Sequence, residues 1–128
     1  MNKFIIMSRK IEIVAGNVSV TAELYDNQMA DDIWEILPIE GSARTWGDEI
    51  YFPIDLKSGY QEDKKEVVEV GELAFWDPGH AFCVFFGPTP GSDVSRPADP
   101  ATVFGKVVGN TEKLKSVPSG SDIKVTKK

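Results

Sequence analysis

Alternating apolar and polar residues mark the first predicted element of the chain. From residue 10 to residue 24, apolar side chains recur at nearly every second position on both sides of Gly16-Asn17. A Gly-Asn pair suits a tight turn, and alternation of this kind is typical of strands with one buried face. Residues 10–24 are therefore predicted to form a β-hairpin.

The apolar period then changes to that of a helix. Apolar side chains fall at helical spacing at Met29, Ala30, Ile33, Trp34 and Leu37. Asp26 or Asn27 can cap the start of such a helix, and Pro38 can end it. One amphipathic helix of about three turns, an ordinary length for a globular protein, is expected here.

Residues 70–87 contain two apolar runs that are too short for ordinary helices. Residues 73–76 and 81–86 are rich in aromatic side chains and valine, and Asp77-Pro78-Gly79-His80 between them has strong turn chemistry. Because residues 82–86 are apolar at every position, both faces of that strand must be covered. This segment is predicted to be the central hairpin of a closed or sandwiched β structure.

The segments around this hairpin are less regular. Ile39–Ser42 is interpreted as a linker, residues 50–52 as a strand, and the polar residues 58–65 as a solvated loop. Residues 88–100 are rich in proline and form a long loop, which is expected to be either functional or mobile.

The C-terminal part is predicted to contain two strands and a short helix. Residues 103–108 read as a strand in which Gly105 indicates a bulge or a close backbone approach. Residues 110–117 favour a short capping helix, and Ile123 and Val125 favour a last strand. The final lysines are expected to be disordered.

Composition and charge narrow the class of protein. Of the 128 residues 41% are apolar, and 20 acidic against 14 basic side chains give a net charge of −6. This balance argues against a nucleic-acid partner, which would need clustered Lys and Arg. No stretch is apolar enough to cross a membrane or to act as a signal peptide, and the single cysteine, Cys83, is expected to be an inert buried thiol. We expect a cytoplasmic protein with one domain over residues 10–126, an N-terminal extension at 1–9 and a C-terminal tail at 127–128.

Three motifs in this order resemble one family. They are TWGDEIYF at residues 45–52, FWDPGHAFCVFFG at 75–87 and VFGKV at 103–107. Together they resemble the compact cyclophilin-like proteins of bacteria and archaea, a group of unknown function with a divergent cyclophilin fold. The resemblance implies a mainly β protein: a closed eight-stranded barrel with one strong and one short capping helix.

The resemblance also bears on prolyl isomerase chemistry. Phe86 matches the groove phenylalanine of the cyclophilins, but Val84 stands at the glutamine position and Ala101 at the histidine position. The family's tryptophan position falls near Arg96, and Arg44 is the only candidate for the catalytic arginine. Little or no isomerase activity is therefore expected.

A ligand groove with a polar and aromatic rim is predicted around these positions. Its candidate residues are Arg44, Trp46, Glu49, Tyr51, Trp76, His80, Val84, Phe86 and Phe104. Strand alternation places Glu49 and Tyr51 on one face, opposite Ile50 and Phe52. Neither a cofactor nor a metal is expected, because the only histidine, His80, lacks neighbouring ligands.

Three functions fit this sequence. The preferred one is a module that binds an extended peptide or a small apolar ligand in the groove. The second is a true peptidyl-prolyl isomerase that uses Arg44. The third is a subunit of a larger amide hydrolase, because cyclophilin-like barrels resemble domains of enzymes such as oxoprolinase; this function would require a protein partner.

Overall fold

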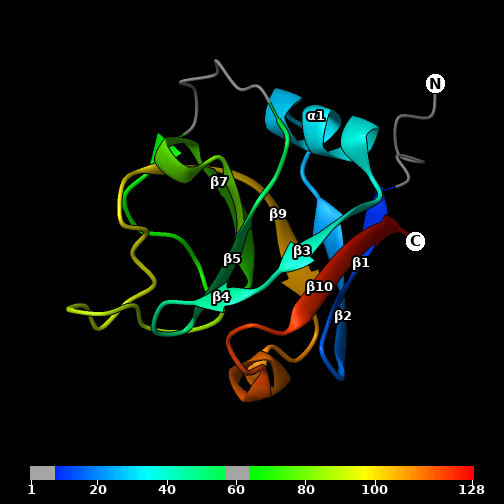
Figure 1. Ribbon diagram of the computed structural model, residues 1–128. Coiled ribbons are helices and arrows are strands. Elements are labelled where there is room, and N and C mark those ends of the chain that lie inside the picture. Colours follow the sequence, from blue (N-terminus) through cyan, green and yellow to red (C-terminus); the bar gives the residue numbers. More distant parts are fainter. Residues whose placement is uncertain (1–7, 57–63) are drawn as a thin grey trace.

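The computed structural model describes residues 8–56 and 64–128, which form an antiparallel β structure with one α-helix (Figure 1). The strands are β1 (Lys10–Ala15), β2 (Val18–Leu24), β3 (Ile39–Ser42), β4 (Arg44–Thr45), β5 (Glu49–Pro53), β6 (Lys64–Lys65), β7 (Glu72–Trp76), β8 (Ala81–Phe85), β9 (Ala101–Val108) and β10 (Asp122–Lys127). The helices are α1 (Gln28–Ile36) and the short 3-10 helices η2 (Asp77–Gly79) and η3 (Glu112–Ser116). None of the helices in the described part of the chain has the length and apolarity needed to span a membrane.

All the strands belong to one sheet. Its hydrogen-bonded order is β3-β10-β1-β2-β9-β7-β8-β5-β4, with β6 paired to β9. The two ends of this order, β3 and β4, follow each other in the chain and are joined by the buried Ala43. The mainly β class and the single α-helix are confirmed. The expectation of eight strands is wrong, since the described residues contain ten, and the sheet they form is not closed by hydrogen bonds.

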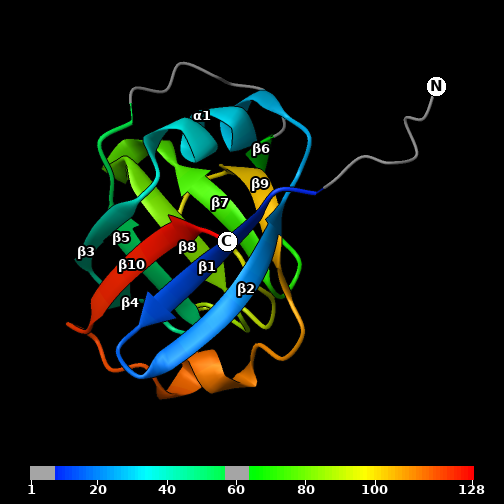
Figure 2. The ribbon, with the colours of Figure 1, turned by 90° about the vertical axis from the view of Figure 1, so that its right-hand side faces the viewer.

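The central hairpin separates two hydrophobic clusters. Phe82 and Val84 of β8 belong to the main core, together with side chains from β1, β2, β10 and α1. Cys83 and Phe85 of the same strand belong to a second cluster on the other face of the sheet. The prediction that both faces of this strand are covered is therefore confirmed. Figure 2 shows α1 across one end of the curved sheet and η3 across the opposite end.

Helix α1 forms as its apolar period predicts. The Asn27 side chain caps the helix by accepting a hydrogen bond from the backbone N–H of Ala30 at 2.9 Å. Met29 and Ile33 are buried in the main core. Trp34 is half-buried at the edge of that core.

Two segments interpreted as irregular are strands. Ile39–Ser42, expected to be a linker, is β3 and pairs with β10, with Gly41 opposite Ile123. Lys64 and Lys65, expected in a polar loop, form β6 against β9; the rest of that expected loop, residues 58–63, lies outside the described residues. Neither segment has apolar alternation, because each contributes little to the core and is held mainly by backbone pairing.

The end of the chain differs from the expected disordered lysine tail. Strand β10 continues to Lys127, which pairs with Ile11 of β1. The backbone N–H of Lys128 donates to the carbonyl of Lys10 at 2.9 Å, and its Nζ donates to Thr21 Oγ1 at 2.7 Å. Lys127 is therefore part of the sheet, and Lys128 is hydrogen-bonded to it directly beyond the end of β10.

Gly105 lies both at a β-bulge and at a close approach of two backbones, the two features that a glycine in this strand predicts. The pairing of β7 with β9 shifts register between Leu73 and Ala74, so that Phe104 is passed over and a bulge forms. A Cβ atom at position 105 would also lie 2.7 Å from the carbonyl oxygen of Glu23 in β2. Only glycine allows β2 and β9 to approach this closely.

Candidate functional site

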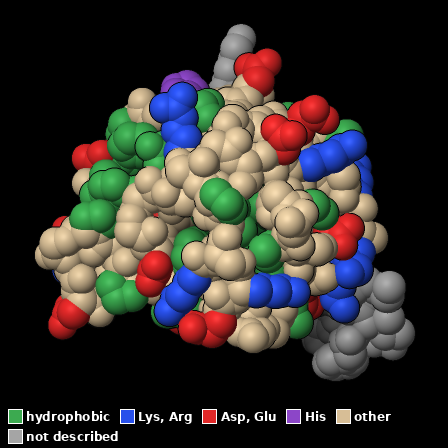
Figure 3. Space-filling view, turned by 60° about the horizontal axis from the view of Figure 1, so that its bottom comes forward, with side chains coloured by type: hydrophobic (Ala, Val, Ile, Leu, Met, Phe, Trp, Pro, Cys, Tyr) green, Lys and Arg blue, Asp and Glu red, His purple; other side chains and the backbone are tan. Residues whose placement is uncertain are grey.

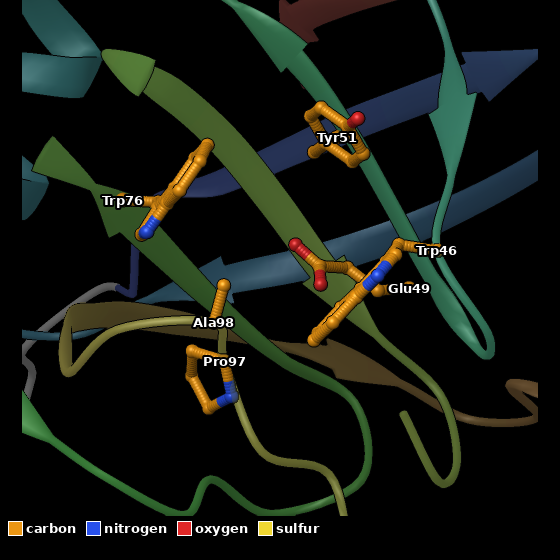
Figure 4. Close-up of a pocket in the computed structure, with 6 residues that line it drawn as sticks. All are labelled: Trp46, Glu49, Tyr51, Trp76, Pro97 and Ala98. Atoms are coloured by element: carbon orange, nitrogen blue, oxygen red, sulfur yellow. The ribbon is translucent and has the colours of Figure 1, made fainter. Parts of the chain in front are cut away.

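A pocket of about 120 Å³ opens on the outer face of the sheet, beside the second hydrophobic cluster. It is lined by Trp46, Glu49, Tyr51, Trp76, Pro97 and Ala98 (Figure 4). Glu49 and Tyr51 come from β5 and Trp76 from the end of β7, while Trp46 lies in the β4–β5 turn. Pro97 and Ala98 lie in the long loop between β8 and β9. Four separate segments therefore build the walls.

The β4–β5 turn sets the position of Trp46. The backbone N–H of Trp46 donates to the carbonyl of Glu49 at 2.9 Å, which closes a tight turn. Gly47 in this turn has a φ of +60°, a conformation that glycine adopts without a steric penalty. A Cβ atom there would lie 2.7 Å from Cδ of Pro90, so the turn also packs closely on the long loop.

Strand alternation then directs Glu49 and Tyr51 into the pocket. Ile50 and Phe52, on the other face of β5, are buried in the main core, as predicted. Glu49 pairs with Phe85 of β8 and Tyr51 pairs with Cys83. Because paired residues share a face of the sheet, the side chains of Cys83 and Phe85 lie beneath the pocket.

The long proline-rich loop forms the third wall and is anchored. Trp76 Nε1 donates to Asp99 Oδ2 at 3.0 Å. Ser95 Oγ donates to the Gly87 carbonyl at 2.6 Å, and Val68 donates its backbone N–H to the Ser95 carbonyl at 2.9 Å. These bonds hold residues 88–100 against the sheet, where the loop contributes Pro97 and Ala98 to the pocket.

Glu49 is the charged group of the pocket, and it is 6% exposed. Burial raises the pKa of its carboxyl to about 7, and a hydrogen bond with the Cys83 thiol offsets part of this rise. Burial, together with the neighbouring Glu49, also raises the pKa of the Cys83 thiol, which is fully buried. The expectation of an inert buried thiol agrees with this environment.

A second buried glutamate, Glu72, provides a useful contrast. Its carboxylate accepts a hydrogen bond from Tyr25 Oη at 2.7 Å and another from the backbone N–H of Glu69 at 2.8 Å. Glu49 receives no hydrogen bond from a nitrogen or oxygen donor of the described residues and forms no ion pair with them. Glu72 is therefore a satisfied structural group, whereas the Glu49 carboxylate faces the open pocket.

The aromatic walls stand at an angle to one another. The ring centroids of Tyr51 and Trp76 are 6.4 Å apart and their planes meet at 77°. Figure 4 shows the Glu49 carboxylate between the rings of Trp76 and Trp46. A small ligand in this pocket would contact aromatic surfaces on several sides and a carboxylate at the base.

Four of the nine candidate residues line the pocket: Trp46, Glu49, Tyr51 and Trp76. Arg44 is exposed and lies directly opposite Tyr51 in the β4–β5 pair, next to the pocket. His80 is exposed in the turn after η2, where its φ is +47°, and it does not line the pocket.

Three candidates occupy a different place from the one expected. Val84, Phe86 and Phe104 were expected to line an outer groove, but they are buried in the main core. The reason is strand parity: Val84 pairs with Ile50, so it shares the inward face and not the face of Tyr51. Val84 therefore lies on the side of the sheet opposite the pocket.

Pro97 and Ala98 also line the pocket and are not among the predicted residues. The available signal was the unusual length and proline content of residues 88–100, since a long ordered loop often carries a binding site. Within residues 8–56 and 64–128, no group of three or more His, Cys, Asp or Glu side chains is arranged to hold a metal ion.

The fold is that of a cyclophilin-like class of β protein, and comparison with known proteins agrees. The model of the cyclophilin-like family matches residues 9–126, and the chain belongs to this family. It is 37% identical to the hypothetical protein AF2241 from Archaeoglobus fulgidus, whose solution structure superimposes with a TM-score of 0.82 over 94% of this chain and 95% of that one.

A more distant likeness shows the fold alone. The structure of McbB, solved in complex with tryptophan, is 18% identical to this chain and has a TM-score of 0.68. The match covers 92% of this chain and 44% of McbB. No curated protein matches the chain.

Proposed function

We propose that this protein is a binding module that takes a small molecule, or a single side chain of a peptide, in the pocket between β5, β7 and the 88–100 loop. The observation that carries the proposal is the pocket itself, with three aromatic side chains and one buried carboxylate. Ligand sites are concave and mostly apolar, with a few polar groups that fix the ligand's orientation. Glu49 is such a group.

The size of the pocket favours a compact ligand. Its volume of about 120 Å³ corresponds to roughly four water molecules at their share of liquid volume. This space suits a small headgroup or one side chain, so an extended peptide would insert one residue and lie along the rim. The exposed Arg44, opposite Tyr51, is placed to contact the part of a ligand that projects from the pocket.

The chemistry of the pocket supports binding without efficient prolyl isomerisation. That reaction needs a cation or a hydrogen-bond donor aimed at the twisted imide. The pocket instead presents a carboxylate, and Val84 and Ala101, at the glutamine and histidine positions of the cyclophilins, are buried apolar side chains.

Chemical-shift mapping with a library of small fragments tests this function. Ligands should shift the indole N–H signals of Trp46 and Trp76 and leave that of Trp34, which lies outside the pocket, unchanged. The variant Trp76→Leu should weaken binding of the same fragments by about tenfold, since stacking on an aromatic wall is lost. The matched variant Trp34→Phe should bind them as the parent protein does. Shifts confined to Trp34, or no shifts with any fragment, would contradict the proposal.

A further inference from the structure

Two features of the pocket together favour one class of ligand. Three aromatic side chains, Trp46, Tyr51 and Trp76, form its walls, and Glu49 supplies a buried carboxylate. We propose that the pocket binds an organic ammonium ion, a protonated or methylated amine with small apolar groups; this inference rests on the binding function proposed above. The positive group would lie against the aromatic rings and beside the Glu49 carboxylate.

The aromatic walls suit a compact cation. The face of an aromatic ring carries negative charge and attracts a cation, most strongly in tryptophan. Because the planes of Tyr51 and Trp76 meet at 77°, they enclose a rounded group better than a flat one. Figure 4 shows Trp46 on the far side of the Glu49 carboxylate from Trp76, so that the rings face the same space.

The protein's third tryptophan already has cations at its ring. The guanidinium carbon of Arg9 lies 5.6 Å from the Trp34 ring centroid, and Lys127 Nζ lies 4.7 Å from it. In the described part of the chain, no lysine or arginine is placed in this way over Trp46 or Trp76. Among the described residues these two rings therefore have no cation of their own, and both line the pocket.

The Glu49 carboxylate lacks a charge partner that such a ligand would supply. It is 6% exposed and forms no ion pair with the described residues. A buried carboxylate is unfavourable unless a cation or hydrogen-bond donors compensate it. An ammonium ion in the pocket would provide both the charge and, when it carries N–H groups, the donors.

Other classes of ligand fit the pocket less well. An anion would be repelled by Glu49. A bare metal ion needs several oxygen ligands, and the pocket offers one carboxylate among aromatic walls. A neutral apolar ligand would bury the Glu49 carboxyl further and would supply neither a positive charge nor a hydrogen bond.

The charges around the pocket are mixed but favour a cation. Asp99, in the 88–100 loop, accepts a hydrogen bond from Trp76 at the edge of the pocket, and the chain as a whole carries a net charge of −6. Arg44 on β4 opposes a cation, but it is exposed, so solvent and salt screen its effect. Among the described residues, the Tyr51 hydroxyl from β5 also lines the pocket, and the Cys83 thiol from β8 lies beneath it.

Choline and its uncharged isostere 3,3-dimethylbutan-1-ol provide a matched pair of probes. The two molecules have nearly the same shape and differ in the positive charge. At pH 8 we expect choline to bind at least tenfold more tightly, with shifts at the Trp46 and Trp76 indole signals. Glu49→Gln should reduce choline affinity at least tenfold. Glu35→Gln, the same change at an exposed position on α1, should leave it unchanged.

The pH dependence provides an independent readout. If choline binds the ionised form of a carboxyl with a pKa of about 7, its affinity should rise roughly thirtyfold from pH 5.5 to pH 8, in proportion to the ionised fraction. The isostere should not gain affinity over this range. In Glu49→Gln, choline affinity should be flat with pH.

The outcomes separate the two proposals. If the alcohol binds in the pocket as tightly as choline, the ammonium inference fails and the binding function stands. If the rise of choline affinity with pH persists in Glu49→Gln, another group is responsible and the inference fails. If neither probe shifts Trp46 or Trp76 and no fragment does so either, both proposals fail.

Discussion

Replacing Glu49 with glutamine is expected to stabilise the free protein at alkaline pH. The side chain is 6% exposed, and burial raises the pKa of its carboxyl from 4.5 to about 7. Between these two values the unfolded chain has released its proton while the folded protein still holds it. The unfolded state then binds fewer protons, so the free energy of unfolding falls as the pH rises.

The size of this effect follows from the difference in pKa. A pKa difference of one between the folded and unfolded states changes the free energy of unfolding by about 1.4 kcal/mol. The rise from 4.5 to about 7 means that Glu49 should lower the free energy of unfolding by about 3 kcal/mol once the pH is well above 7. About 2.5 kcal/mol of this should appear between pH 5 and pH 8.5, because the unfolded carboxyl is already mostly ionised at pH 5 and the rest of the effect develops below that pH. Glutamine has nearly the same shape and does not titrate, so it should remove the contribution of Glu49 to the pH dependence of the free energy of unfolding.

Urea unfolding at pH 5, 6, 7 and 8.5, followed by circular dichroism, would measure how Glu49 changes the free energy of unfolding with pH. The quantity of interest is the difference in free energy of unfolding between Glu49→Gln and the parent, since the titration of other groups cancels in that difference. We expect it to grow with pH by about 2.5 kcal/mol. For Glu35→Gln, an exposed position on α1, the same difference should stay constant. A difference for Glu49→Gln that is flat within about 0.5 kcal/mol, or that falls with pH, would refute the reasoning.

Two further predictions concern the fold around the pocket. Gly105→Ala should lower the free energy of unfolding by about 1–3 kcal/mol, because its Cβ would lie 2.7 Å from the Glu23 carbonyl oxygen; an unchanged urea midpoint would contradict the close approach of β2 and β9. Cys83 should not react with a thiol reagent such as Ellman's reagent in the folded protein and should react fully in urea, since burial raises the pKa of its thiol; rapid labelling of the folded protein would show that the thiol is accessible.

The elements that the sequence predicts well are those that carry their own signal. The hairpin of β1 and β2 and helix α1 each have a regular apolar period, the central hairpin has two apolar runs around a turn, and each forms as expected. Strands β3 and β6 have no such period, because backbone pairing with β10 and β9 holds them. That pairing depends on distant residues, so local sequence cannot predict it.

The part of the candidate site that the sequence predicts also lies where the local apolar pattern is clear. Alternation along β5 predicts Glu49 and Tyr51 on one face, because Ile50 and Phe52, which alternate with them, are strongly apolar; both predicted residues line the pocket. In β8 every side chain is apolar, so alternation gives no clue to which face is inward. Only the resemblance to the cyclophilins predicts that Val84 and Phe86 line the groove, and both are buried in the main core. The loop wall of Pro97 and Ala98 depends on long-range packing.

The place of β10 in the sheet determines the order in which the fold can be completed. This strand lies between β1 and β3, and both of these precede it by most of the length of the chain. The two hairpins can form from neighbouring residues, but β1 and β3 obtain their shared partner only when the last strand has been synthesised. Pairing between such distant segments carries a large loop-closure cost and slows folding. On the ribosome, β1 therefore lacks one of its two neighbouring strands until β10 has been synthesised.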